Sequence, residues 1–317
     1  MRLVGVLIAC VLLSGCVDSK PQALSSWAEG ATKSAIIDFV AGVTSEGSPD
    51  FVPVVDRIAV FDHDGTLWAE RPEYFQFLMI YEQVRAQAVD HPEWREEQPF
   101  KAVLENDTAY LDGLDYAAAR QLSAAVSGGM KTTDYMALSH DFATRSLHPG
   151  SNARYADLRY LPMLELLEYL EGHSFRVFIV SGGDMGFIRG FSEPLYGVSR
   201  DRVVGSSRSN MFADDSSTIL RGEKYASMNV GANKVLNIDL HIGRPPVFAV
   251  GNSDGDLAML TYTASHDGFV LLLSHDDGER EYDYISGAEV ALQTAHEKGW
   301  AIASMRDDFE RIFVRTD

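Results

Sequence analysis

Short apolar runs rich in β-branched residues alternate with helix-like segments along most of this chain, and this alternation limits the folds that the chain can adopt. Such runs predict strands that are buried on both faces, and strands separated by helices predict a parallel sheet covered on both sides. We therefore expect an α/β fold with a Rossmann-like parallel sheet flanked by helices. The predicted strands are residues 57–61, 176–180, 246–250 and 269–273.

Apolar residues at helical spacing predict helices between these strands. About a hundred residues separate the first two strands, far more than a crossover connection needs. We therefore expect a helical cap inserted at residues 72–159, between core segments 27–71 and 160–317. Residues 203–220 predict a hairpin near the site. The predicted helices are residues 27–43, 73–89, 114–126, 132–145 with Thr132 and Thr133 available as N-caps, and 162–170 with Pro162 at its start.

The first sixteen residues have the pattern of an export signal. Arg2 precedes the apolar run 3–13, which is too short to span a membrane. The sequence Leu-Ser-Gly-Cys ending at Cys16 resembles the lipobox of bacterial lipoproteins, which implies a signal peptide over 1–15 and lipidation of Cys16. Residues 16–26 are then a polar tether to a lipid bilayer, facing the periplasm, and Val17 favours the outer membrane. An ordinary secreted protein with a chance cysteine is the alternative.

Charge and cysteine content exclude several classes of protein. Lysine and arginine number 27 against 46 aspartates and glutamates, a formal net charge of −19. Such a chain repels phosphate backbones, so a basic nucleic-acid footprint is excluded. The only cysteines are Cys10 and Cys16, so the rest of the chain has no disulfide framework and no cysteine nucleophile. An anionic substrate would need a local cation, which a metal ion can supply.

Two carboxylates, Asp62 and Asp64, follow the first predicted strand directly and precede a glycine turn. The first carboxylate can attack a phosphorus atom, and the second can protonate the leaving oxygen and then deprotonate water. Taken alone, the pattern also fits a turn or part of a calcium loop. Thr66 and Leu67 break the spacing of an EF-hand loop.

Three further polar clusters lie near predicted strand or helix ends. Ser181 and Gly182 follow the second strand and offer a hydroxyl and free amides at an expected helix N-terminus, which suits a phosphate group. Lys234 supplies a cation. Asn252 and Asp256 follow the third strand and carry the oxygen ligands that Mg²⁺ prefers. Ligands of open α/β sheets bind beyond the carboxyl ends of the strands, so we expect these clusters to meet there.

The ordered set of motifs resembles the haloacid dehalogenase superfamily in its phosphatase branch. The motifs are Asp-x-Asp-Gly-Thr from Asp62, the strand-end serine, the lysine and an acidic loop from Asn252. The resemblance implies that Asp62 is the phosphoryl-accepting nucleophile and Asp64 the general acid/base. It also implies that Thr66, Ser181, Gly182 and Lys234 bind phosphate. The implied ligands of Mg²⁺ are Asp62, the carbonyl of Asp64 and Asn252, with Asp256 nearby.

Two positions depart from the family pattern. Asn252 stands where an Asp is usual, which removes one negative charge from the metal site, and Asp254 could compensate. The cap position resembles the C1 type of the phosphoserine phosphatase branch, which places an acidic residue nine positions after the nucleophile. That position is Arg71 here, between Glu70 and Glu73. We expect substrate selectivity to reside in these three residues and in the cap.

The sequence thus predicts a Mg²⁺-dependent phosphomonoester hydrolase that works through an aspartyl-phosphate. Its expected substrate is a small phosphorylated metabolite, with phosphoserine the best single named one. The alternatives are phosphoryl transfer to another acceptor, cleavage of phosphonates or haloacids, and a phosphate-binding lipoprotein with weak or no catalysis.

Overall fold

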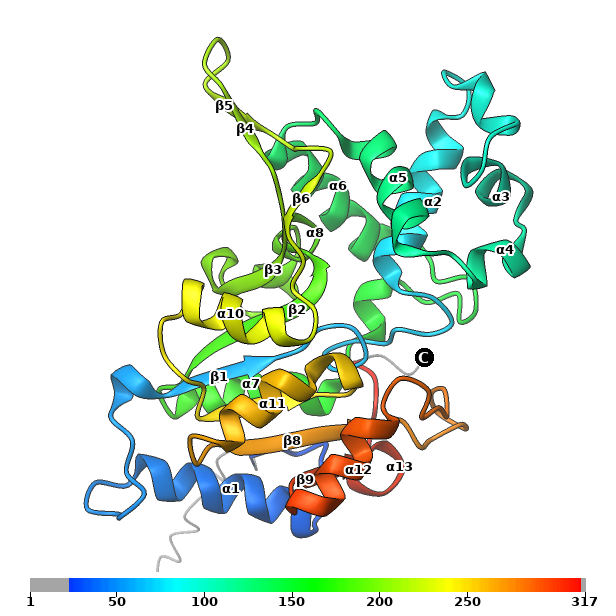
Figure 1. Ribbon diagram of the computed structural model, residues 1–317. Coiled ribbons are helices and arrows are strands. Elements are labelled where there is room, and N and C mark those ends of the chain that lie inside the picture. Colours follow the sequence, from blue (N-terminus) through cyan, green and yellow to red (C-terminus); the bar gives the residue numbers. More distant parts are fainter. Residues whose placement is uncertain (1–22, 315–317) are drawn as a thin grey trace, which may run out of the picture.

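A computed structural model describes residues 23–314; the predicted signal peptide and Cys16 lie outside them. The centre is a seven-stranded sheet in the order β6-β3-β2-β1-β7-β8-β9 (Figure 1). All neighbours pair in parallel except β6, which is antiparallel to β3. The predicted α/β fold is confirmed. The strands are β1 (Ile58–Phe61), β2 (Arg176–Asp184), β3 (Val203–Arg208), β6 (Tyr225–Ser227), β7 (Phe248–Gly251), β8 (Phe269–Ser274) and β9 (Ala301–Ser304).

Alternate residues of the central strands fill two separate hydrophobic cores, one on each face of the sheet. In β1, Ala59 and Phe61 belong to the core under α1 and α7, whereas Ile58 and Val60 belong to the core under α10, α11 and α12. This alternation follows from the two-residue period of a strand. The covering helices are α1 (Ala31–Thr44), α7 (Leu161–Gly172), α10 (Ala232–His241), α11 (Leu257–Ala264) and α12 (Glu289–Lys298).

The segment predicted as the cap, residues 72–159, contains a group of helices beyond one end of the sheet (Figure 1). Five of them are α2 (Phe75–Gln87), α3 (Phe100–Glu105), α4 (Thr108–Asp112), α5 (Tyr116–Ser127) and α6 (Thr132–Arg145). Helices α2, α3 and α5 enclose a third hydrophobic core that includes Ile80, Trp94 and Leu122. The buried apolar residues of α6 belong instead to the core under α1 and α7. The domain boundaries themselves stay a prediction. The remaining α-helices are α8 (Met185–Arg189), α9 (Ser192–Tyr196) and α13 (Met305–Asp308), and the 3₁₀ turns are Val54–Asp56, Pro92–Arg95, Tyr155–Leu158, Arg200–Arg202 and Asp254–Asp256.

The predicted hairpin at residues 203–220 is only partly right. Its first part is β3, which joins the main sheet beside β2. The hairpin itself is the short pair β4 (Met211–Ala213) and β5 (Thr218–Leu220), which projects away from the sheet (Figure 1). None of its residues lines the cavity described below, so the expectation that it lies near the site is wrong.

Two local predictions are also corrected, one on the end of the tether and one on the N-cap of α6. The tether was expected to reach residue 26, but Leu24 and Trp27 are buried, and the backbone N–H of Ser26 donates to Glu165 at 2.8 Å. The chain is therefore packed against the core from Leu24 onward. Thr132 and Thr133 are not the N-cap of α6, because Thr132 is already its first helical residue. The N-cap is Lys131, whose side chain makes no capping hydrogen bond. Within residues 23–314, no helix is both long and apolar enough to cross a membrane.

Candidate active site

A cavity of about 310 Å³ lies between the carboxyl ends of the strands and the cap helices. Its core side is lined by residues that follow or end β1, β2 and β7, including Asp62, Ser181 and Asp256. Its cap side is lined by α2 and α5, including Phe77 and Arg120. The polar clusters expected to meet at this edge of the sheet therefore do meet.

Lys234 joins two carboxylates at the floor of this cavity. Its Nζ lies 2.6 Å from Asp62 Oδ1, 2.6 Å from Asp256 Oδ1 and 2.9 Å from the carbonyl oxygen of Val180. Burial lowers the pKa of Lys234, but the charges of Asp256 and Asp62 outweigh burial and raise it above its usual range. The lysine is therefore a permanent cation at neutral pH.

Asp62 carries an unusually basic carboxylate. Burial and the neighbouring charge of Asp256 raise the pKa of Asp62 to about 8, although Lys234 acts in the opposite direction. One lysine thus does not neutralise two buried carboxylates fully. Ionised Asp62 would be stabilised by a further positive charge in the cavity.

Asp64 also lines the cavity, and an indole holds it in place. Trp68 Nε1 donates to Asp64 Oδ1 at 2.7 Å, and Trp68 is fully buried among aromatic side chains. His63 is buried beside the same indole, with its Nε2 3.1 Å from the hydroxyl of Tyr196. The carboxylate of Asp64 is thereby oriented while its side chain stays partly exposed.

Thr66, Asn252 and Glu70 form a buried chain of hydrogen bonds. Thr66 Oγ1 donates to Asn252 Oδ1 at 3.1 Å, and Asn252 Nδ2 donates to Glu70 Oε1 at 3.2 Å. Gly65 has φ +69°, and a Cβ there would lie 2.1 Å from Asn252 Nδ2, so only glycine fits. Neither Thr66 nor Asn252 lines the cavity. That Thr66 binds phosphate stays a prediction.

The acidic loop after β7 is held by Asp256. Its Oδ2 accepts hydrogen bonds from the backbone N–H groups of Asn252 and Ser253, at 3.0 and 3.1 Å. Asp254 faces elsewhere: its Oδ1 accepts from the backbone N–H of Ala291 at 2.7 Å, and it does not line the cavity. Asp254 therefore does not replace the charge that Asn252 lacks.

Ser181, Gly182 and Gly183 line the cavity, but they belong to the strand and not to a helix start. Strand β2 continues to Asp184, and α8 begins only at Met185 with Asp184 as its N-cap. Ser181 Oγ accepts a hydrogen bond from the backbone N–H of Gly183 at 3.0 Å, so its own proton is free to bind an anion. The predicted cradle at a helix N-terminus is corrected to a hydroxyl within the last part of strand β2.

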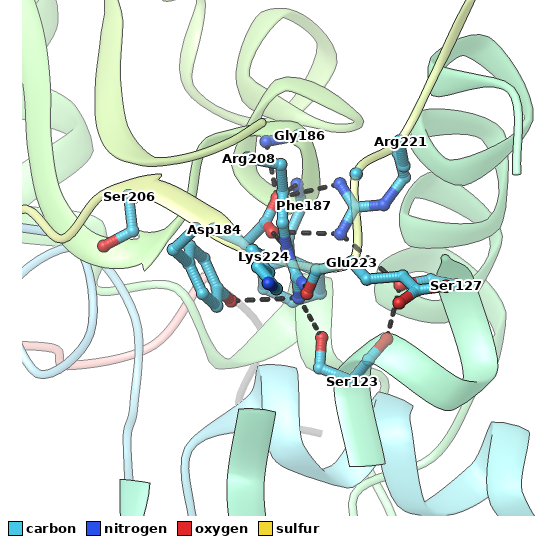
Figure 2. A network of polar contacts seen from close by, with 12 residues as sticks. Ser123, Ser127, Asp184, Gly186, Phe187, Ser206, Arg208, Arg221, Glu223 and Lys224 are labelled. Atoms are coloured by element: carbon cyan, nitrogen blue, oxygen red, sulfur yellow. Dashed lines mark hydrogen bonds and ion pairs between the residues drawn. The ribbon is translucent and has the colours of Figure 1, made fainter. Parts of the chain in front are cut away.

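A buried ionic cluster beside the cavity joins the core to the cap, and sequence reasoning missed it (Figure 2). Asp184 Oδ2 accepts from Arg208 Nε at 3.1 Å and from Arg221 Nη2 at 3.0 Å. The two guanidinium groups also donate to the hydroxyls of Ser123 and Ser127 in α5. The sequence signal for this cluster was Arg208, which lies in a segment rich in β-branched residues. A charge buried in such a segment needs an ionic partner.

The three predicted selectivity residues have different surroundings. Glu70 lines the cavity, whereas Arg71 and Glu73 do not. The guanidinium of Arg71 lies 4.4 Å from the ring centre of Tyr284, and Glu73 accepts from the backbone N–H of Tyr74. Arg120 in α5 does line the cavity, and it has no hydrogen bond or ion pair with any of the described residues. Sequence reasoning did not single out Arg120.

The donor set fits a divalent cation only if neutral oxygens take part. No three Asp, Glu, His or Cys side chains among residues 23–314 are grouped so that they could hold a metal ion. Asp62, the carbonyl of Asp64 and Asn252 Oδ1 are hard oxygen donors of the type that Mg²⁺ prefers. The incompletely neutralised Asp62 is consistent with a cation at this place.

A mostly parallel sheet with a carboxylate-lined cavity at its strand ends defines a doubly wound α/β protein with an acidic pocket. The model of the haloacid dehalogenase-like hydrolase family matches residues 59–261, which is more than half of the chain. This chain belongs to that family, so the resemblance read from the motifs is confirmed at the level of the family. Among curated proteins, none matches the chain.

Two of the solved structures similar to this chain share its fold at low sequence identity, and a third is less similar. A conserved, functionally unknown protein from Anaerococcus prevotii DSM 20548 is 16% identical, with TM-score 0.57 over 85% of this chain and 90% of that chain. A protein of unknown function from Bordetella pertussis Tohama I is 13% identical, with TM-score 0.51 over 78% and 97%. A phosphoserine phosphohydrolase-like protein from Francisella tularensis subsp. tularensis SCHU S4 is 14% identical, with TM-score 0.43 over 78% and 94%.

Proposed function

We propose that this hydrolase cleaves phosphate monoesters through a phosphoryl group carried on Asp62. The observation that carries the proposal is the buried Asp62 carboxylate in a cavity with Asp64 and Lys234. Asp62 attacks phosphorus, and the ester oxygen leaves with a proton from Asp64. Asp64 then takes a proton from water, whose oxygen attacks the same phosphorus. Phosphate leaves, and Asp62 is regenerated.

Lys234 and Ser181 support this reaction from the floor of the cavity. The ammonium group of Lys234 keeps positive charge next to the attacking oxygen and can pair with a phosphoryl oxygen. The Ser181 hydroxyl offers a proton that no described acceptor takes. Preformed donors of this kind stabilise charge that develops in a transition state without having to reorganise.

We propose Mg²⁺ as the cofactor, held by Asp62, the carbonyl of Asp64 and Asn252. When bound, the ion would supply positive charge that keeps Asp62 ionised and offsets the charge of the phosphoryl oxygens. The supporting observation is the raised pKa of Asp62, which follows from burial and from Asp256.

Hydrolysis of p-nitrophenyl phosphate with Mg²⁺ and with EDTA tests the proposal. We expect turnover with Mg²⁺ and background rates with EDTA, and restored turnover when Mg²⁺ is added back. Asn252 favours a second candidate, a phosphate-binding protein with weak catalysis, because it removes a charge from the metal site. Phosphate binding without turnover in any metal would support that candidate and contradict the hydrolase.

The free cation Arg120 suggests a substrate with a second anionic group, such as the carboxylate of phosphoserine. We expect Arg120→Ala to lower kcat/KM for phosphoserine by about tenfold or more, because it removes a hydrogen-bonded ionic contact to the carboxylate of the substrate. The value for p-nitrophenyl phosphate, which lacks a second anion, should change little. The ratio of the two values measures this effect, and an unchanged ratio excludes Arg120 from selection. Arg145→Ala, which changes an exposed cap arginine, is the matched control.

We also propose that the mature chain begins at Cys16 and is anchored to the bacterial outer membrane, facing the periplasm. The motif at Cys16 supports this location. Fractionation of cells that express Cys16→Ser tests it, because a processed, membrane-bound variant would contradict lipidation.

A further inference from the structure

Glu70 lies beside Asn252, one of the two positions where this chain departs from the family pattern. Asn252 carries an amide in place of a carboxylate, and Asp254 faces away from the cavity. Glu70 is buried, lines the cavity and contacts the Asn252 amide directly. Its carboxylate also lies against Gly65, beside Asp64, where an added Cβ would come within 2.8 Å of Glu70 Cδ.

The pairing of Asn252 with Glu70 decides which way the amide faces. A carboxylate only accepts hydrogen bonds, so the NH₂ group of Asn252 must point at Glu70. The carbonyl oxygen of Asn252 then points to the other side, where it accepts from Thr66 Oγ1 and keeps a second lone pair. The hydrogen bond to Glu70 therefore turns the carbonyl oxygen of Asn252, and not its NH₂ group, to the side away from Glu70.

Glu70 itself is anchored on one oxygen only. Its Oε1 accepts from Tyr284 Oη at 2.6 Å as well as from Asn252. Its Oε2 receives no hydrogen bond from any described residue. An aspartate at position 252 would place two carboxylates in direct contact, which like-charge repulsion disfavours. The amide at 252 and the carboxylate at 70 are therefore chemically matched.

We propose that Glu70 is part of the divalent-cation site: it supplies the negative charge that Asn252 lacks and orients the Asn252 carbonyl oxygen as a ligand. This inference rests on the proposed Mg²⁺-dependent function and deepens it. Glu70 acts through Asn252 and through the charge of its free oxygen, so its role is positional and electrostatic.

Mg²⁺ binding to the purified full chain, measured by titration calorimetry without phosphate or substrate, tests the proposal. Glu70→Gln keeps size and hydrogen-bonding capacity but loses the charge, and we expect about 10–100-fold weaker Mg²⁺ binding, as for other groups that support metal ligands. Glu82→Gln removes an exposed carboxylate of α2 that does not line the cavity and should bind Mg²⁺ as the wild type does.

The exchange variant Glu70→Gln with Asn252→Asp moves the charge back to position 252 and preserves an amide–carboxylate pair. We expect its Mg²⁺ affinity to return to within about threefold of the wild type. Circular dichroism and thermal unfolding without metal show whether each variant folds. If Glu70→Gln alone does not fold, the exchange variant still decides, because failure to recover binding in a folded exchange variant overturns the proposal.

The outcomes separate this inference from the proposed function. Wild-type affinity in Glu70→Gln overturns the role of Glu70 and leaves Mg²⁺-dependent hydrolysis standing. A wild-type chain that binds no Mg²⁺ at millimolar concentrations overturns both the inference and the proposed cofactor.

Discussion

Asp62→Asn should reduce phosphatase activity to background while leaving the fold intact. The amide is a poor nucleophile, so the step that carries phosphorus on residue 62 is lost entirely. Asp64→Asn should cost less, about 10²–10⁴-fold, because it removes proton transfer and not the attacking group. The loss at Asp64 should be smaller for p-nitrophenyl phosphate, whose leaving oxygen needs little protonation, than for an alkyl phosphate. Initial rates of the purified variants measure both effects.

The stability of Asp62→Asn shows whether its loss of activity comes from lost chemistry or from unfolding. The folded-state pKa of Asp62, about 8, lies above its ordinary value of 3.8, so the folded state holds the proton more tightly. The contribution of this group to stability is therefore lost as pH rises from about 4 through 8. Without divalent metal, the variant should be at least as stable as the wild type at pH 8. Near-normal turnover by this variant would exclude an aspartyl-phosphate and require attack by water instead.

The main strands could be predicted because buried strands appear in the sequence as short apolar runs. Strand β3 was missed as a sheet strand because its second half is polar, at Ser206, Ser207 and Arg208. Ser206 is buried there because its hydroxyl donates to the carbonyl of Gly182 at 2.7 Å, a contact that only the folded sheet creates. Strand β9 is short and mostly small, so local sequence does not distinguish it from a helix or loop.

Site residues that directly follow strands could be predicted from the sequence. Site residues whose positions depend on contacts between distant parts of the chain could not. Asp62 and Asp64 follow β1, and Ser181 directly follows the predicted part of β2, so topology alone brings them to one edge. Glu70 reaches Asn252 across 182 positions of sequence, and no local pattern specifies that contact. The orientation of Arg120 toward the cavity likewise depends on how α5 packs in the cap.

The buried cluster around Asp184 should be the most sensitive point for stability. Its carboxylate accepts from Arg208 Nε and from Arg221 Nη1 and Nη2, at 3.0 to 3.2 Å, and from the backbone N–H of Gly186 at 2.9 Å. All three charged side chains are at most 3% exposed. Asp184→Asn would leave two buried guanidinium groups without a counter-charge. Removing one partner of a buried ion pair costs about 3–5 kcal/mol in the free energy of unfolding.

This loss should depend on pH in a defined direction. Burial raises the pKa of Asp184, but Arg221 and Arg208 outweigh burial and hold it below its ordinary value of 3.8. The stabilisation from a lowered carboxyl pKa is complete above the unfolded value and disappears as pH falls through the folded value. The difference between wild type and Asp184→Asn should therefore be full at pH 7 and shrink as the solution is acidified below about pH 4.

Denaturant unfolding of both proteins at neutral and acidic pH measures this difference. Asp141→Asn is the matched control, because Asp141 pairs with Arg145 at 3.5 Å on the exposed face of α6 and should contribute less than about 1 kcal/mol. Because Arg208 and Arg221 also hold Ser123 and Ser127 of α5, loss of the carboxylate should loosen the cap on the core. Hydrogen exchange of α5 should rise in Asp184→Asn and stay unchanged in the control. Equal stability of the two variants at pH 7 would show that the cluster does not hold the cap.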